Sequence, residues 1–153
     1  MAAKKVSLSE YEAAVGTEVG VSDWLAVDQA RIIGFADVTQ DHQYIHVDPE
    51  AAKASPFGGT IAHGFLTLSL LSALAAGVLP TLEGQTAAVN FGFNGIRFPS
   101  PVPSGKRIRA RFELKAVRLR SPGVIQSTVG VTIEIEAGLK PALVAEWLTL
   151  AYL

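Results

Sequence analysis

The segment from Phe65 to Ala76 constrains the fold most, because it is apolar on every face of a helix. Its leucines are Leu66, Leu68, Leu70, Leu71 and Leu74, and its polar residues are only threonine and serine. A soluble protein tolerates such a helix when other elements surround it. The stretch is also shorter than the roughly 18 residues of a membrane-spanning helix. We therefore expect Phe65–Ala76 to be the central, buried helix of the fold.

From Gln85 onward the hydrophobic period changes to that of β-strands. Apolar residues alternate with others from Ala87 to Phe93, from Ile108 to Leu114 and from Val129 to Ile135. Such alternation is typical of strands that bury one face. The almost continuously apolar segment Leu143–Tyr152 predicts a central or interface-covered strand. Helices followed by long antiparallel strands indicate the α+β class, with a sheet curled around the central helix.

The first part of the chain predicts short accessory elements. Ser7 and Glu10 have the spacing of a capping box and predict a short helix. Val19–Val27 is typical of a strand, and Asp28 is a suitable N-cap for a helix that ends near Thr39. We expect one domain over residues 1–153, in which residues 1–18 are an accessory N-terminal segment.

Composition excludes several classes of function. The chain has 153 residues, a net charge of −1 and no cysteine. No basic field is available for nucleic acid or an anionic membrane, and neither a disulfide nor a cysteine-ligated metal can form. The N-terminal residues do not have the pattern of a secretory signal, so we expect a cytoplasmic protein. Because 49% of the residues are hydrophobic, a further buried surface such as a homodimer interface is expected.

The stretch from Thr39 to Leu71 contains all three histidines. Asp48 followed by proline predicts a new helix, so the polar loop 40–47 should be held between helices. Asp41 and His46 are five residues apart and would point about 140° away from each other on a helix. In a loop they can converge, and a carboxylate beside an imidazole suits general acid–base catalysis. On the residues alone, an Asp41 turn cap and a structural, half-buried His46 remain the more frequent interpretation.

Gly64 is expected at the start of the central helix, where backbone N–H groups are unpaired and the helix dipole is positive. These groups can stabilise an oxyanion, and a glycine lets a substrate carbonyl approach the backbone. The alternative is that Gly64 serves only close packing or an unusual backbone angle.

A metal site is a further interpretation of this stretch. His42 and His46 have i, i+4 spacing, and Asp41 and His63 are near in sequence. Pro49 and its cap argue against a helix at the histidine pair, however, and no glutamate lies between the histidines as in zinc proteases. We therefore expect no metal and no other cofactor.

Two motifs resemble a known family. Residues 41–46 read DHQYIH and residues 61–65 read IAHGF, and together they resemble the hydratase motif of the MaoC-like (R)-specific enoyl-CoA hydratases, which have a hotdog fold. The resemblance covers Val19–Leu153 and extends to the short, stand-alone actinobacterial members through residues 90–92 and 97–99. It implies that Asp41 and His46 are the catalytic pair. It also implies that the Gly64 N–H binds the thioester oxygen.

The chain departs from the commoner form of the motif inside the catalytic loop. That form has Gly-Asp-x-Asn-Pro before the hydrophobic residue and the histidine, whereas this chain has Gln40, Gln43 and Tyr44 at the glycine, asparagine and proline positions. The acid and the base are retained. The differences therefore concern loop geometry and substrate preference more than the reaction.

The resemblance predicts a lyase of fatty acid metabolism that reversibly hydrates trans-2-enoyl-CoA to (R)-3-hydroxyacyl-CoA. His46 would be the base, and Asp41 would assist proton delivery to C2. Phe65, Leu68 and Ser72 are candidate walls of an acyl tunnel. The cations available for the CoA phosphates are Arg97, Lys106, Arg107 and Arg109. We prefer to interpret these four as a solvated strand face, and keep Arg97 as a candidate ligand of the substrate.

Two other functions remain open at this point. A hotdog thioesterase would use the same helix N-terminus with an acidic residue, and it would release free CoA. A non-catalytic acyl-CoA-binding subunit would have lost its acid or its base. The presence of both Asp41 and His46 favours the hydratase over either alternative.

Overall fold

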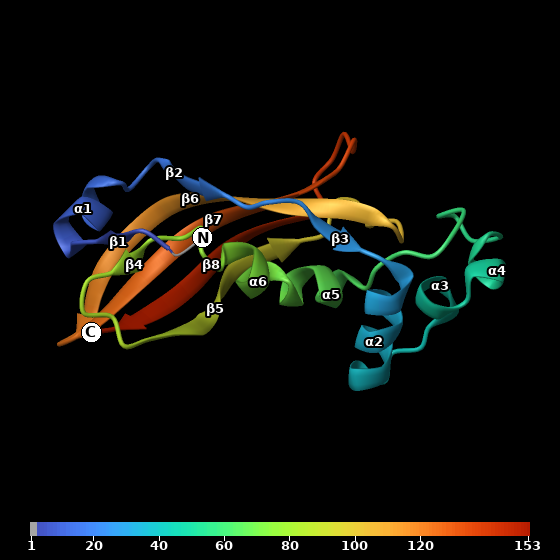
Figure 1. Ribbon diagram of the computed structural model, residues 1–153, viewed down its shortest axis with the longest axis horizontal. Coiled ribbons are helices and arrows are strands. Elements are labelled where there is room, and N and C mark those ends of the chain that lie inside the picture. Colours follow the sequence, from blue (N-terminus) through green and yellow to red (C-terminus); the bar gives the residue numbers. More distant parts are fainter. Residues whose placement is uncertain (1–2) are drawn as a thin grey trace.

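A long antiparallel sheet dominates the computed structural model, which describes residues 3–153 (Figure 1). Its strands are β2 (Glu18–Val21), β3 (Leu25–Val27), β5 (Ala87–Arg97), β6 (Lys106–Ser121), β7 (Val124–Ile135) and β8 (Leu143–Tyr152). The order across the sheet is β2, β6, β7, β8 and β5, and β3 pairs with β6 beside β2. A separate pair of short parallel strands joins β1 (Lys5–Val6) to β4 (Thr81–Leu82). The predicted α+β class is confirmed.

Three of the six helices within residues 3–153 begin at a residue whose side chain caps the first turn. The six helices are α1 (Leu8–Ala13), α2 (Gln29–Thr39), α3 (Tyr44–Val47), α4 (Pro49–Ala52), α5 (Gly64–Ser69) and α6 (Leu71–Ala75). Ser7 forms the predicted capping box with Glu10. The carboxylates of Asp28 and Asp48 accept hydrogen bonds from the first turns of α2 and α4. A cap of this kind stabilises a helix by about 1 kcal/mol. No helix within residues 3–153 has the length and apolar character required to cross a membrane.

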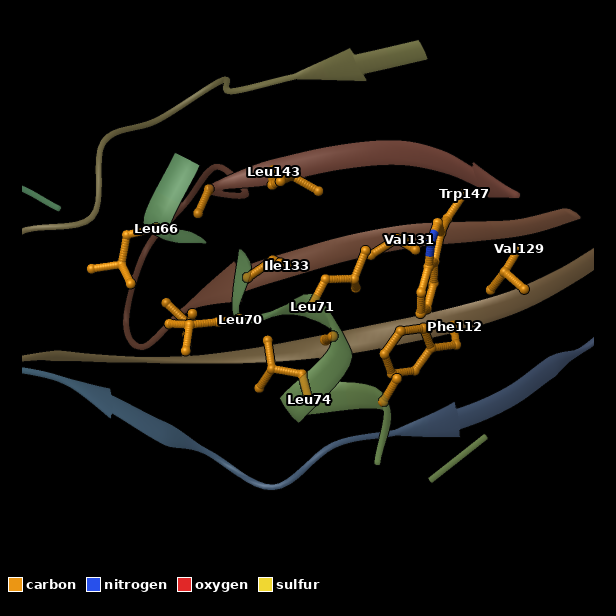
Figure 2. Packing of buried hydrophobic residues seen from close by; sticks show 14 of the residues in the cluster. Leu66, Leu70, Leu71, Leu74, Phe112, Val129, Val131, Ile133, Leu143 and Trp147 are labelled. Atoms are coloured by element: carbon orange, nitrogen blue, oxygen red, sulfur yellow. The ribbon is translucent and has the colours of Figure 1, made fainter. Parts of the chain in front are cut away.

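The core lies between the α5–α6 helical segment and the concave face of the sheet (Figure 2). The helical leucines Leu66, Leu70, Leu71 and Leu74 point toward strand residues that include Phe112, Val131, Ile133 and Leu143. The predicted alternation is confirmed in β6 and β7, because their inward side chains are buried from Ile108 to Leu114 and from Val129 to Ile135. Full burial of one such side chain contributes about 1.5–3 kcal/mol. This packing fixes the helix against the sheet.

The central helix departs from the prediction in two ways. It is divided at Leu70 into α5 and α6, and one of its faces is not covered by any part of residues 3–153. Phe65, Ser69, Ser72 and Ala76 lie on that face, and the Phe65 side chain is 69% exposed. The expectation of a helix surrounded on every side was therefore wrong for a single chain.

The edge strand β5 also exposes apolar side chains. Val89 and Phe91 alternate as predicted, but each is 44% exposed. Two register shifts, between Asn90 and Gly92 and between Phe93 and Gly95, interrupt its pairing with β8. Such shifts bend a strand and increase its twist. Its expected burial of one face is not found in the single chain.

The predicted strand Val19–Val27 is also two strands, β2 and β3. At Ser22 the backbone N–H donates to the Ala110 carbonyl at 2.8 Å, but the hydroxyl of Ser22, rather than its carbonyl, accepts from the Ala110 N–H at 2.9 Å. The Ser22 hydroxyl thus replaces a backbone carbonyl in the hydrogen-bond ladder. Serine side chains can do so because they compete with the backbone for its hydrogen bonds. The sheet therefore continues past a local interruption.

Candidate active site

Asp41 follows directly on the end of α2. Gln40 has a φ of 62°, and this left-handed residue ends the helix and turns the chain into the loop that contains Asp41. The Asp41 carboxylate is about half exposed, with 52% of the side chain accessible. An acidic group in this position is open to a ligand that arrives from solvent.

His46 lies on the single turn α3, so the expected open loop 40–47 contains a short helix. The side chain is 7% exposed, and its Nδ1 is 2.7 Å from the Ile61 carbonyl oxygen. Because a carbonyl only accepts, Nδ1 carries the proton and the neutral ring presents a lone pair at Nε2. Burial lowers the pKa of His46, and His63 lowers it further, against opposing effects of the Ile61 hydrogen bond and Asp41. A neutral imidazole with a free Nε2 is the form that a general base requires.

A hydrogen-bond network holds the backbone around His46. The Gln29 amide donates to the His46 carbonyl at 2.7 Å, and the Thr60 hydroxyl donates to the Gln29 side-chain oxygen at 2.5 Å. The Ile61 N–H also donates to the Ile45 carbonyl at 3.0 Å. Helix α2 and the segment before α5 therefore both fix α3. No local sequence pattern indicated a role for Gln29 or Thr60.

His63 joins the two members of the predicted pair. Its ring stacks on His46 with centroids 3.8 Å apart, and its Nε2 donates to the Asp41 carbonyl at 3.0 Å. Its Nε2 is also 4.0 Å from the Asp41 carboxylate. The His63 side chain is 3% exposed, and its ring centroid lies 5.0 Å from that of Phe35. His42 lies apart from this cluster and pairs with Asp37 at 2.9 Å.

Gly64 opens α5 beside a hollow of about 200 Å³ that His46, Thr67 and Phe98 also line. His63 occupies the N-cap position without a side-chain bond to the first turn, so the N–H groups of that turn remain available. A Cβ atom at Gly64 would lie 3.2 Å from the Phe98 ring. The glycine therefore allows Phe98 to close over the helix start, and it leaves a backbone donor next to His46.

Asp41, His46 and His63 also form a possible metal cluster, because each offers a ligand atom within 4.8 Å of the other two. Only part of this set offers the lone pairs that a metal ion needs. His46 Nδ1 and His63 Nε2 both face carbonyl oxygens, so these nitrogens carry protons rather than free lone pairs. The same arrangement leaves His46 Nε2 and the Asp41 carboxylate for proton transfer.

The other predicted substrate residues are dispersed along α5, α6 and β5. Phe65 packs edge-on against Phe98, with ring centroids 6.4 Å apart, and Leu68 is partly buried against the core. Ser72 lies about two turns further along and lines a separate cavity. Arg97 ends β5, and its guanidinium donates to the Ile96 carbonyl at 2.9 Å. The structure therefore brings Asp41, His46 and Gly64 together, while Ser72 and Arg97 lie outside this group.

The remaining cations agree with the preferred interpretation of a solvated strand face. Arg107 forms an ion pair with Glu136, and Arg109 contacts Glu134 at 2.5 Å. Arg109 also lies over the Trp24 ring, 4.6 Å from its centroid. These guanidinium groups are already paired on the outer face of the sheet.

Comparisons with known proteins agree with this architecture. A family model described as "MaoC like domain" matches residues 10–136. The chain is 50% identical over 148 residues to "Nodulation protein N" of Rhizobium meliloti, covering 96% of this chain and 92% of the relative. It is 50% identical over 140 residues to "3-hydroxyacyl-thioester dehydratase Z" of Mycobacterium tuberculosis, covering 92% of each chain. The solved (R)-hydratase from A. caviae superimposes with a TM-score of 0.69 and 26% identity, over 88% of this chain and 96% of that chain.

Proposed function

The chain belongs to the MaoC-like dehydratase family, which has the hotdog fold, and on that premise we propose that it is a hydro-lyase acting on 3-hydroxyacyl thioesters. The proposed reaction is the reversible interconversion of a trans-2-enoyl thioester and water with an (R)-3-hydroxyacyl thioester. One observation carries the proposal. Asp41 and His46, which are linked through His63, lie together where Gly64 begins α5.

In the hydration direction, His46 removes a proton from water at its free Nε2 while the water oxygen bonds to C3. The C2–C3 π electrons then move toward the thioester and form an enolate. The Gly64 N–H and the positive end of α5 stabilise the charge on the thioester oxygen. Collapse of the enolate places on C2 the proton that His46 took from water, so His46 becomes neutral again, and Asp41 orients the water and assists this delivery. Dehydration follows the same steps in reverse.

The protonation state of His46 supports its role as the base. Burial lowers the pKa of His46, which keeps the ring neutral near pH 7. The Ile61 carbonyl fixes the tautomer through Nδ1, so the lone pair is always at Nε2. Asp41 remains half exposed and can exchange protons with solvent between turnovers.

We further propose that two copies of the chain form a homodimer. The uncovered face of α5–α6 exposes Phe65 and the neighbouring Phe98, which pack edge-on against each other and are each at least 44% accessible. Aromatic residues concentrated on one surface are typical of the core of a protein–protein interface. A second copy would cover the helix face that is open in the single chain.

The proposed reaction is tested by following the loss of enoyl absorbance with crotonyl-CoA. We expect absorbance to fall until hydration equilibrium is reached, without release of a free thiol. An (S)-specific 3-hydroxyacyl-CoA dehydrogenase should leave the product unoxidised, because the product has the (R) configuration. Free CoA detected by a thiol reagent would instead indicate a thioesterase.

A further inference from the structure

The inward face of the sheet is apolar along most of its length but polar in one cross-strand row. Ser127 of β7 pairs with Thr149 of β8, and Thr149 pairs with Asn90 of β5. Paired residues on antiparallel strands point to the same side of the sheet. Ser127 lies between the buried residues Ile125 and Val129, which alternate with the outward positions, and is itself 4% exposed. The row therefore runs along the inner face of the sheet from the buried Ser127 through the half-buried Thr149 to Asn90, which is exposed on the edge strand.

This row borders a cavity of about 300 Å³ at the C-terminal end of α6, and its other polar lining residues are Tyr11, Ser72, Thr81 and Gln85. Burial raises the pKa of the Tyr11 phenol, and the Ser127 hydroxyl partly opposes that rise. Within residues 3–153, the side chains of Ser72, Asn90 and Thr149 make no hydrogen bond to another residue, although they line this cavity. Ser72 and Asn90 are exposed at the mouth of the cavity and Thr149 is half-buried, so the three side chains can form hydrogen bonds with a ligand or with water.

The wall of the cavity limits the charge of its ligand. Its lining combines these polar residues with apolar ones such as Leu79, Trp147 and Leu150, and among residues 3–153 it includes no lysine, arginine, histidine, aspartate or glutamate. A carboxylate or an ammonium group would be buried there without an opposite charge, which is strongly unfavourable. A hydroxyl or carbonyl group could form hydrogen bonds with these side chains in place of its bonds to water, so its burial would cost little free energy.

The cavity lies at the far end of the surface that begins at the candidate active site. Ser72 follows Gly64 by eight residues, a helical rise of about 12 Å. Strand β5 connects the same two places. Phe98, just after the end of β5, lies beside Gly64, and Asn90 within β5 lines the cavity together with Ser72. Figure 1 shows α5, α6 and β5 beside one another. An extended chain advances about 1.2 Å per bond, so about ten bonds would span this distance.

We propose that the acyl group of the substrate carries an uncharged oxygen function, a hydroxyl or a keto group, about ten bonds from the thioester. The inference rests on the proposed function, because it places the thioester at Gly64. A plain alkyl tail would displace water from Ser127, Thr149 and Asn90 without returning a hydrogen bond. A site that binds a substrate hydroxyl discriminates against an analogue without it for the same reason.

The test compares trans-2-dodecenoyl-CoA with its ω-hydroxy and ω-carboxy derivatives. We expect kcat/KM to be roughly tenfold higher for the hydroxy substrate than for the plain one, and lowest for the carboxy substrate. Ser127→Ala and Thr149→Val preserve size and remove hydroxyl groups, so each should reduce the preference several-fold. Crotonyl-CoA is too short to reach the cavity, and its kcat/KM should be unchanged in both variants.

Equal kcat/KM values for the plain and hydroxy substrates would overturn the inference, as would a preference that both variants retain. Failure to hydrate even crotonyl-CoA would instead overturn the proposed function. In that case the cavity can still be tested by measuring ligand affinity. The fluorescence of Trp147 in the Trp24→Phe protein would report the binding of dodecanoyl-CoA and of its ω-hydroxy derivative. Tighter binding of the hydroxy ligand, weakened by Ser127→Ala, would support a polar tail site, and equal binding would exclude it.

Discussion

Replacement of His63 by phenylalanine isolates the link between Asp41 and His46. Phenylalanine retains a ring that can stack on His46, but it removes the donor to the Asp41 carbonyl at 3.0 Å. One lost hydrogen bond costs about 0.5–1.5 kcal/mol. The substitution also removes the His63 Nδ1, a buried atom without a partner among the described residues, which offsets part of that cost. We therefore expect a small change in stability, no more than roughly 4 °C in Tm.

The effect of His63→Phe on catalysis should be much larger than its effect on stability. Without the bond to its carbonyl, Asp41 loses a fixed position relative to His46, and a displacement of about 1 Å can reduce a rate roughly 100-fold. His63 also lowers the pKa of His46. Its removal should raise that pKa, so the base becomes protonated earlier as pH falls. The acidic limb of the kcat/KM profile should therefore move to higher pH.

The assay is the pH dependence of crotonyl-CoA hydration, measured beside thermal unfolding. His42→Phe is the matched control, because His42 is exposed and pairs only with Asp37 outside the cluster. We expect the control to retain its rate and its pH profile. A His63→Phe protein with the parent rate and an unmoved acidic limb would refute the proposed positioning of Asp41 by His63.

Three further substitutions test other parts of the structure. Gly64→Ala places a Cβ 3.2 Å from the Phe98 ring and should lower kcat/KM at least tenfold. A second change, Phe98→Ala, should partly restore the activity. An unchanged kcat/KM in the single variant would contradict close approach of the substrate to this glycine. Leu71→Ala removes most of a side chain that is 2% exposed and should lower the free energy of unfolding by about 2–5 kcal/mol, measured by urea denaturation. A loss below about 1 kcal/mol would indicate that the helix is loosely packed. Phe65→Glu places a charge on the uncovered face of α5 and should convert a dimer to a monomer in sedimentation equilibrium, whereas a monomeric parent protein would contradict the homodimer.

Local sequence patterns predicted the fold well where one chain segment determined its own structure. The caps at Ser7, Asp28 and Asp48 and the alternation in β6 and β7 are of this kind. The break between β2 and β3 was not predictable, because it depends on a bond between the Ser22 hydroxyl and the distant Ala110. The open face of α5–α6 was missed for a related reason. Hydrophobicity shows that a surface needs cover, but it does not show whether the cover comes from the same chain.

The candidate site shows the same division. The spacing of Asp41 and His46 and the position of Gly64 could be found in the sequence, and the structure places these residues together. The connection through His63 could not be found, since it depends on ring stacking and on a bond to a backbone carbonyl. The same holds for Gln29 and Thr60, which hold the backbone of α3 from outside the motif.

The most direct test of the central claim is the rate of crotonyl-CoA hydration by the Asp41→Asn and His46→Gln variants beside the parent protein. Both substitutions retain size and hydrogen-bonding capacity but remove a group that can transfer a proton at neutral pH. General acid–base catalysis contributes roughly 100- to 10,000-fold, so we expect losses in kcat within that range and unchanged thermal unfolding. Parent rates in both variants would show that Asp41 and His46 are not the acid–base pair.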